Sequence, residues 1–180
     1  GLSMSLLVMK FGGTSLASTD LIKEAAERVK AQVLLGYEVV VIVSAMSGKT
    51  NELVGWVNDT SSMYDAREYD AVVSSGEQVT AGLMALVLQE LDVPARSWLG
   101  WQVPLKTKGS HGAARIKDIS TENINQKFSE GMKVAVIAGF QGLSEDNRIT
   151  TLGRGGSDTT AVAFAAAFKA VRCDISVSYT

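Results

Sequence analysis

Short apolar runs alternate with glycine-containing turns and helical patterns along this 180-residue chain. Residues 6–10 form an apolar run that ends at Gly12-Gly13, and apolar residues then repeat at helical spacing over residues 21–33. Gly36 is placed to end that helix, and residues 38–45 (EVVVIVSA) follow as a nearly continuous β-branched run. A strand with no polar side needs cover on both faces, which predicts a parallel strand–helix–strand unit.

The same alternation continues to the end of the chain. Helices are predicted at residues 77–90, 121–129 and 159–169, and strands at residues 96–99, 115–119, 133–138 and 171–175. Residues 106–112 are polar and are predicted to form a loop. Ser18 is expected to cap the first helix, and Ser157 or Asp158 the last one. The predicted class is α/β, with a mostly parallel sheet covered by helices on both faces and ligands at the carboxyl ends of its strands.

Composition excludes several classes of protein. The chain is 46% hydrophobic and 20% charged, which is enough apolar material for a folded core. Its net charge is −2, without a block of one sign, so charge gives no support to nucleic-acid or anionic-membrane binding. No apolar run reaches the ~18 residues of a membrane-spanning helix. The single cysteine, Cys173, precludes an internal disulfide and suits a cytoplasmic protein, and the single histidine, His111, precludes a metal site built from several histidines.

The first turn with potential chemistry has the sequence KFGGTS. Gly12 and Gly13 let the backbone approach a phosphate, and Lys10 supplies a positive charge at the strand end. Thr14 and Ser15 add hydroxyl donors. A plain tight turn with a solvated lysine remains the alternative at this point.

The second turn contains a Gly-Lys-Thr triplet at residues 48–50, which resembles the end of a phosphate-binding P-loop. A P-loop also needs glycine five positions earlier, where this chain has Val43 inside the predicted strand. The turn can still offer hydroxyl groups to a small anion, from Ser44, Ser47 and Thr50. The alternative is a polar connection in which Asn51 caps a helix.

Glu77 lies in the third turn, directly before an apolar helix. A glutamate in the first turn of a helix ordinarily complements the helix dipole. A functional interpretation is that Glu77 points into a cleft and pairs with an ammonium group. The residues alone leave both interpretations open.

The fourth turn covers residues 150–160 and places three glycines around Arg154. Arginine can bind a carboxylate or phosphate through two parallel hydrogen bonds, and the following helix start directs N–H groups at an anion. Asp158 fits such a site if it orients a lysine, a metal or an amine. A flexible loop with an ordinary helix cap is the alternative. Residues 138–142 also follow a predicted strand and are expected to line the same cleft.

Taken together, these turns resemble the aspartate kinases of the amino-acid kinase family. The resemblance runs in order from residue 9 to about residue 175. It rests on KFGGTS (10–15), VSAM (43–46), SGEQ (75–78), AGFQG (138–142) and TLGRGGSDTT (151–160). It implies a three-layer αβα sandwich around a mainly parallel sheet. The implied activity is transfer of the ATP γ-phosphate to the β-carboxylate of L-aspartate, the first step of lysine, threonine and methionine biosynthesis, with Mg²⁺ accompanying ATP rather than held by protein side chains.

The resemblance also implies roles for individual residues. Lys10 would contact the transferring phosphate, and Asp158 would organise that lysine. Glu77 would pair with the substrate α-ammonium, and Arg154 would hold a substrate carboxylate. Further contacts to the substrate are expected from Ser44, Thr50 and Ser157, and further contacts to the ATP phosphates from Gly12, Gly13, Thr14, Gly155 and Gly156.

The family pattern continues past residue 175 with a strand and loop that shape the nucleotide site, and then with regulatory ACT domains. Residues 4–175 are therefore expected to be the N-terminal portion of the catalytic domain, and residues 176–180 (SVSYT) a tail that does not match. The expectation is a truncated chain with impaired activity, whose full-length form is a homo-oligomer, a dimer. The alternative is an inactive fragment that binds aspartate or another anion, or that pairs with another subunit. A P-loop nucleoside triphosphatase is a third possibility, which substitution of Lys49 would distinguish.

Overall fold

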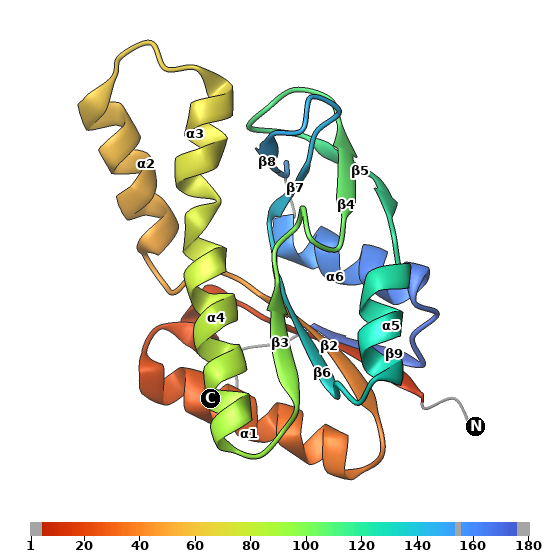
Figure 1. Cartoon of the computed structure of the whole chain (residues 1–180). Coiled ribbons are helices and arrows are strands. Elements are labelled where there is room, and N and C mark those ends of the chain that lie inside the picture. The colour runs from red at the N-terminus through yellow and green to blue at the C-terminus, as the bar shows by residue number, and fades with distance from the viewer. Residues whose placement is uncertain (1–4, 154–155, 176–180) are drawn as a thin grey trace.

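A parallel sheet forms the centre of the protein in the computed structural model, which describes residues 5–153 and 156–175. Its five strands lie in the order β3-β6-β2-β1-β9, and every neighbouring pair is parallel (Figure 1). These strands are β1 (Leu6–Phe11), β2 (Glu38–Val43), β3 (Ala95–Trp98), β6 (Val134–Ala138) and β9 (Arg172–Ile175). The mainly parallel sheet is therefore confirmed, with strand ends close to those predicted.

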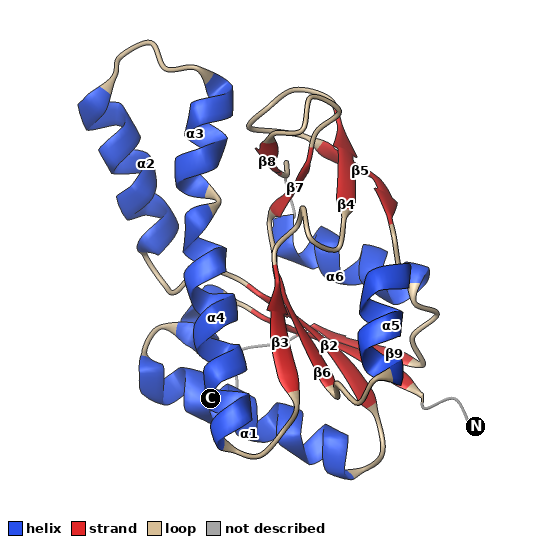
Figure 2. Ribbon diagram, viewed as in Figure 1, coloured by secondary structure: helices blue, strands red, loops and turns tan. Residues whose placement is uncertain are grey.

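Helices cover both faces of this sheet, which confirms the three-layer arrangement (Figure 2). One face is covered by α1 (Thr19–Leu34) and α4 (Ser75–Glu90), and the other by α5 (Glu122–Ser129) and α6 (Gly156–Ala167). Two further helices, α2 (Lys49–Thr60) and α3 (Ala66–Val73), form a hairpin beside the sheet. The sequence pattern over residues 49–73 does not predict this hairpin.

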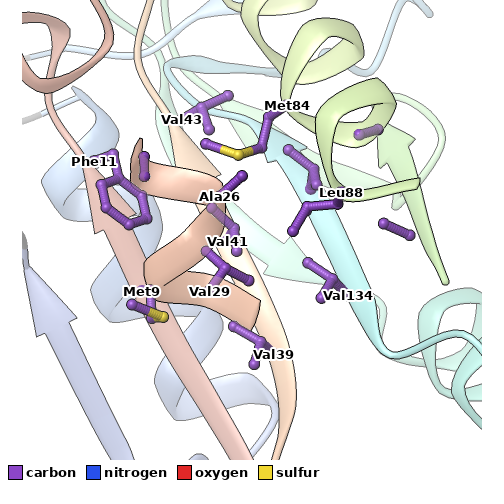
Figure 3. Close-up of a cluster of buried hydrophobic side chains, with 14 of the residues drawn as sticks. Met9, Phe11, Ala26, Val29, Val39, Val41, Val43, Met84, Leu88 and Val134 are labelled. Atoms are coloured by element: carbon purple, nitrogen blue, oxygen red, sulfur yellow. The ribbon is translucent and has the colours of Figure 1, made fainter. Parts of the chain in front are cut away.

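Side chains of the central strands alternate between two cores. Along β1, Leu7 and Met9 pack in the core under α1 and α4, whereas Val8 packs in the core under α6. Figure 3 shows the first of these cores, in which Val41 of β2 lies near Met84 of α4. Because both faces are buried, each such side chain contributes about 1.5–3 kcal/mol and no position in the strand interior is left for polar chemistry. Polar residues are thereby confined to the strand ends.

The first helix begins and ends as predicted. Ser18 adopts an extended conformation, and its side-chain oxygen accepts a hydrogen bond from the backbone N–H of Leu21 at 3.2 Å. Gly36 has φ of +104°, a left-handed conformation that glycine adopts without a steric penalty. Two other cap positions are wrong by a few residues: Asn51, given as an alternative, and Ser157 or Asp158. Helix α2 already begins after Gly48, so Asn51 lies inside it, and α6 begins at Gly156, so Ser157 and Asp158 lie in its first turn.

A second, mixed sheet stands over the carboxyl end of the parallel sheet (Figure 1). Its order is β5-β4-β7-β8, with strands β4 (Leu105–Lys108), β5 (Arg115–Ile119), β7 (Gln141–Leu143) and β8 (Ile149–Thr151). The predicted loop over residues 106–112 is therefore wrong at its start. Leu105 and Thr107 are buried while the two lysines between and after them are exposed, an alternation typical of a half-buried strand.

Helices α3 and α4 run on as one 25-residue helix, Ala66–Glu90. By length and composition this is the one helix in the described part of the chain that could cross a membrane. Half of its apolar window is buried inside the protein, where α4 packs on α1 and on strands β3 and β6. This burial is what the core helix of a folded domain shows.

Gly142 of β7 is held against strand β4 without room for a side chain. A Cβ at this position would overlap the Thr107 methyl group and lie 2.9 Å from the Leu105 carbonyl oxygen. We expect Gly142→Ala to lower the free energy of unfolding by about 1–3 kcal/mol, because the strands must separate to admit the methyl group. Gly55→Ala in α2 is the matched control, since its Cβ would meet nothing within 4 Å. It should raise stability by up to about 1 kcal/mol in denaturant titrations, and an equal loss in both variants would contradict the expectation.

Candidate functional site

A cavity of about 920 Å³ lies at the carboxyl ends of β1, β2 and β6, where the parallel sheet meets the start of α6. It gathers predicted site residues from segments far apart in the sequence. These are Lys10, Gly13, Thr14, Ser44, Thr50, Glu77, Gly156, Ser157 and Asp158. Gly12 is not in the cavity wall but lies beside the Lys10 side chain, and the predicted residues Arg154 and Gly155 lie outside the described residues. The turns after β1, β2 and β6 thus meet as expected, although the fourth turn follows β8 of the second sheet.

Lys10 and Asp158 form an ion pair in this cavity. Lys10 Nζ lies 2.8 Å from Asp158 Oδ1, with the lysine side chain 11% exposed and the aspartate 56% exposed. Lys10 stands near the end of β1 and Asp158 in the first turn of α6. The pair gives Lys10 a counter-charge where little water reaches it, and it fixes the direction of the ammonium group. This is the geometry that a lysine-organising role for Asp158 requires.

The glycine turn after β1 makes a close backbone approach to the turn after β2. A Cβ on Gly13 would lie 3.0 Å from the carbonyl oxygen of Ala45, so glycine is the residue that lets these turns pack. The turn itself is a short 3₁₀ helix, Gly13–Leu16, which begins beside the cavity. The structure therefore supplies a packing reason for Gly13 besides the predicted approach to phosphate.

Glu77 is the most perturbed acid in the cavity wall. Its side chain is 3% exposed, and its Oε1 accepts a hydrogen bond from the Ala45 N–H at 3.3 Å. Its other oxygen, Oε2, is buried with no hydrogen-bond partner among the described residues. Burial raises the pKa of Glu77 from its ordinary value of 4.5 to about 7, because the backbone N–H groups of Glu77 and Ala45 offset only part of the lost hydration.

The structure weakens the helix-dipole interpretation of Glu77. Glu77 lies in the first turn of α4, but α3 runs into α4 through Ser74, so this turn is not a free N-terminus. A buried carboxylate oxygen without a partner, in the wall of a cavity, is instead suited to a hydrogen-bond donor or cation of a ligand.

Hydroxyl groups line the wall between the β2 turn and α6. Ser44 Oγ and Ser157 Oγ lie 2.9 Å apart, so each can both hydrogen-bond the other and face a ligand. Thr50 reaches the cavity from the first turn of α2, but Lys49 is not among the lining residues. The Lys49 ammonium instead pairs with Glu52 at 3.1 Å on the helix surface. This position does not support the P-loop alternative, which needs the lysine over the phosphates.

One part of the cavity wall was not predicted. Gly112 and Ala113 line it from the loop before β5, and neither has a side chain that would have marked it. Leu152 and Gly153, which lie within the fourth turn, also line the cavity. Phe140, from the segment expected to line the cleft, does so with φ of +68°, a conformation that is uncommon for a bulky residue.

The shifted Glu77 pKa predicts a pH-dependent difference between wild type and Glu77→Gln. The folded state holds its proton up to a pH of about 7 while the unfolded chain releases it near 4.5, so the Glu77 contribution to stability falls as pH rises through this window. We expect the glutamine variant, which can still accept from Ala45, to gain roughly 3 kcal/mol relative to wild type between pH 4.5 and pH 8. Urea titrations at a series of pH values measure this difference, and a pH-independent difference would contradict it.

Comparison with known proteins identifies relatives over nearly the whole chain. The sequence profile described as the amino acid kinase family matches residues 5–177. Aspartokinase from Rickettsia felis is 50% identical over 175 residues, which cover 96% of this chain and 43% of that protein. This chain thus spans less than half the length of that relative.

Solved structures show the same relationship. The aspartate kinase from Synechocystis superposes with a TM-score of 0.82 at 43% identity, over 97% of this chain and 29% of that one. Aspartokinase III from E. coli, solved in complex with aspartate and ADP, gives a TM-score of 0.81 at 25% identity, over 94% of this chain and 48% of that one. The family profile, the sequence relatives and the fold agree, and the chain belongs to the amino acid kinase family.

Proposed function

We propose that this chain carries the aspartate-binding and phosphate-binding part of an aspartate kinase, which transfers the ATP γ-phosphate to the β-carboxylate of L-aspartate. The observation that carries the proposal is Glu77, a buried carboxylate with one oxygen lacking a partner, in the same cavity as Lys10. A site for an amino acid needs an anion for its ammonium group, and a site for phosphoryl transfer needs a cation. The Rickettsia felis relative, whose sequence is 50% identical to this chain, is an aspartokinase, and the E. coli structure contains aspartate and ADP.

In this proposal Glu77 pairs with the α-ammonium of aspartate. Ser44, Thr50 and Ser157 offer hydroxyl groups to its carboxylates from the same cavity. The sequence resemblance assigns a further carboxylate contact to Arg154. The two ends of the substrate would thus be held by groups of opposite charge, which fixes the direction in which the β-carboxylate faces the nucleotide.

The transfer step itself needs no general base, because the β-carboxylate is ionised at neutral pH. One carboxylate oxygen forms a bond to the γ-phosphorus while the bond from that phosphorus to the β–γ bridging oxygen breaks, and ADP leaves with the electron pair. Alignment and neutralisation of charge are then the main demands on the protein. Lys10 would balance charge on the transferring phosphate, and Asp158 would hold the lysine in place.

Mg²⁺ would accompany the nucleotide. No group of three or more His, Cys, Asp or Glu side chains suited to a metal occurs within residues 5–153 and 156–175. The cavity does contain one half-exposed carboxylate, Asp158, which fits an ion that takes most of its ligands from phosphate oxygens and water. When bound, the ion would supply charge neutralisation on the phosphates. We further propose that the full-length protein is a cytoplasmic dimer and that it acts in lysine, threonine and methionine biosynthesis.

Trapping of the acyl phosphate with hydroxylamine tests the activity. In the full-length protein we expect product that depends on both ATP and L-aspartate, and a loss of at least about 100-fold with Lys10→Ala, because a phosphate charge is left unbalanced. Lys49→Ala is the matched control and should stay within about twofold, since its side chain lies outside the cavity. The opposite ranking would favour the P-loop alternative. Aspartate binding without product in the 180-residue chain would favour the binding-fragment alternative.

Aspartate affinity should depend on pH through Glu77. The ammonium group binds the ionised carboxylate, so affinity should rise up to about tenfold per pH unit below the pKa of about 7 and level off above it. Calorimetry at pH 5.5 to 8.5 measures this rise, and Glu77→Gln should weaken binding and remove the pH dependence. Unchanged aspartate affinity in Glu77→Gln would exclude the ammonium role.

Arg154→Ala should weaken aspartate binding far more than ADP binding.

A further inference from the structure

Two buried carboxylates lie on one face of the long helix formed by α3 and α4. Asp70 and Glu77 are seven residues apart, which is two helical turns, or about 10 Å along the axis. Asp70 is 0% exposed and Glu77 is 3% exposed. Their surroundings differ in one respect. Glu77 keeps an oxygen without a partner and faces the cavity, whereas both oxygens of Asp70 accept hydrogen bonds and Asp70 is not in the cavity wall.

Asp70 receives its hydrogen bonds from two different segments. Oδ2 accepts from the Gly112 backbone N–H at 3.0 Å and lies 2.8 Å from His111 Nδ1. Oδ1 accepts from the Thr151 hydroxyl at 2.7 Å. A carboxylate removed from water is tolerated when its lone pairs are satisfied in this way, and hydrogen bonds to a charged group are stronger than neutral ones.

These two segments also contribute residues to the cavity wall, at positions separate from Glu77. They are joined by two backbone hydrogen bonds, from Ala114 N–H to the Thr151 carbonyl at 3.2 Å and from Gly153 N–H to the Ala114 carbonyl at 3.0 Å. Gly112 and Gly153 lie in the wall itself. Asp70 thus binds the joined segments beside the residues that they contribute to the cavity wall.

We infer that Asp70 is a positioning residue for the substrate cavity. Because Asp70 and Glu77 lie on the same long helix, it fixes the distance between Glu77 and the lining residues Gly112, Ala113, Leu152 and Gly153. Packing of α3 on β8 would be served equally by an apolar side chain, whereas three donors from two segments need an acceptor with several lone pairs. This inference rests on the proposed function, in which Glu77 binds the ammonium group of an aspartate molecule held in this cavity.

Adjacent threonines on β8 provide a matched test. Thr150 and Thr151 are both 0% exposed, and each makes a buried hydroxyl hydrogen bond, Thr150 to Thr107 at 3.1 Å and Thr151 to Asp70. Replacement by valine keeps the shape and removes one hydroxyl in either case. We expect Thr151→Val to raise the dissociation constant for L-aspartate about tenfold, as for loss of one hydrogen bond to a charged group. Thr150→Val should leave it within about twofold, although it also lowers thermal stability through the loss of its hydrogen bond to Thr107.

Hydrogen exchange of the ligand-free protein gives a second readout that does not depend on the proposed function. Thr151→Val should speed exchange in segments 112–114 and 151–153 more than Thr150→Val does. Asp70→Asn, which keeps the size but loses the charge, should exceed both if it folds. Equal effects of the two threonine variants on aspartate binding and on exchange would overturn the inference. A wild-type protein that binds no aspartate would refute the proposed function, and the exchange comparison would then decide the positioning role by itself.

Discussion

Burial of both faces of the parallel sheet is the constraint on which the rest of the structure depends. Strands β1, β2 and β6 pack into two cores, so the side chains in their interior serve apolar packing. Polar groups must therefore collect where the strands end. The carboxyl ends of parallel strands lie at one edge, and the cavity that contains Lys10 and Ser44 forms there. The position of the candidate site is thus a consequence of the way the core is built.

The second constraint is the long helix Ala66–Glu90, which passes beside this edge. Its C-terminal part is held in the first core by Met84 and Leu88, and its N-terminal part by Asp70 through hydrogen bonds to the second sheet. A helix fixed at both ends carries any residue between them as a rigid support. Glu77 occupies that intermediate position, which explains how a carboxylate can remain buried with an unsatisfied oxygen and not turn toward water.

The sequence was sufficient for elements whose signal is local. The β-branched run of β2 and the Ser18 and Gly36 boundaries of α1 each follow from neighbouring residues, and the structure has them where expected. It was insufficient for β7 and β8, because strands of three residues are too short to show a period. Helix α2 was foreseen only as the alternative in which Asn51 caps a helix, because Trp56 is 54% exposed and the apolar residues of α2 do not mark one buried face.

The candidate site likewise contains residues that the sequence could predict and residues that it could not. Motif residues such as Lys10 and Asp158 could be expected to meet, because Lys10 lies near the carboxyl end of a strand and Asp158 in the first turn of a helix. The contact of Asp70 with Thr151 spans 81 residues of sequence and has no local signal, so pattern reasoning could not find it. Glu77 was ambiguous until the structure showed that α3 and α4 are continuous. A residue's chemistry was readable from its type, but its burial and its partners depended on the tertiary fold.

The balance of charge in the cavity explains why the site needs both an ammonium-binding group and a phosphate-binding group. Lys10, Glu77 and Asp158 are the charged residues among its described lining, and the first and last of these already neutralise each other. Glu77 is thus the acid without a partner of opposite charge, and its burial raises its pKa. An ammonium group would restore the balance there. A phosphate would instead have to share Lys10 with Asp158, and because Asp158 is half-exposed it can yield that contact at little cost.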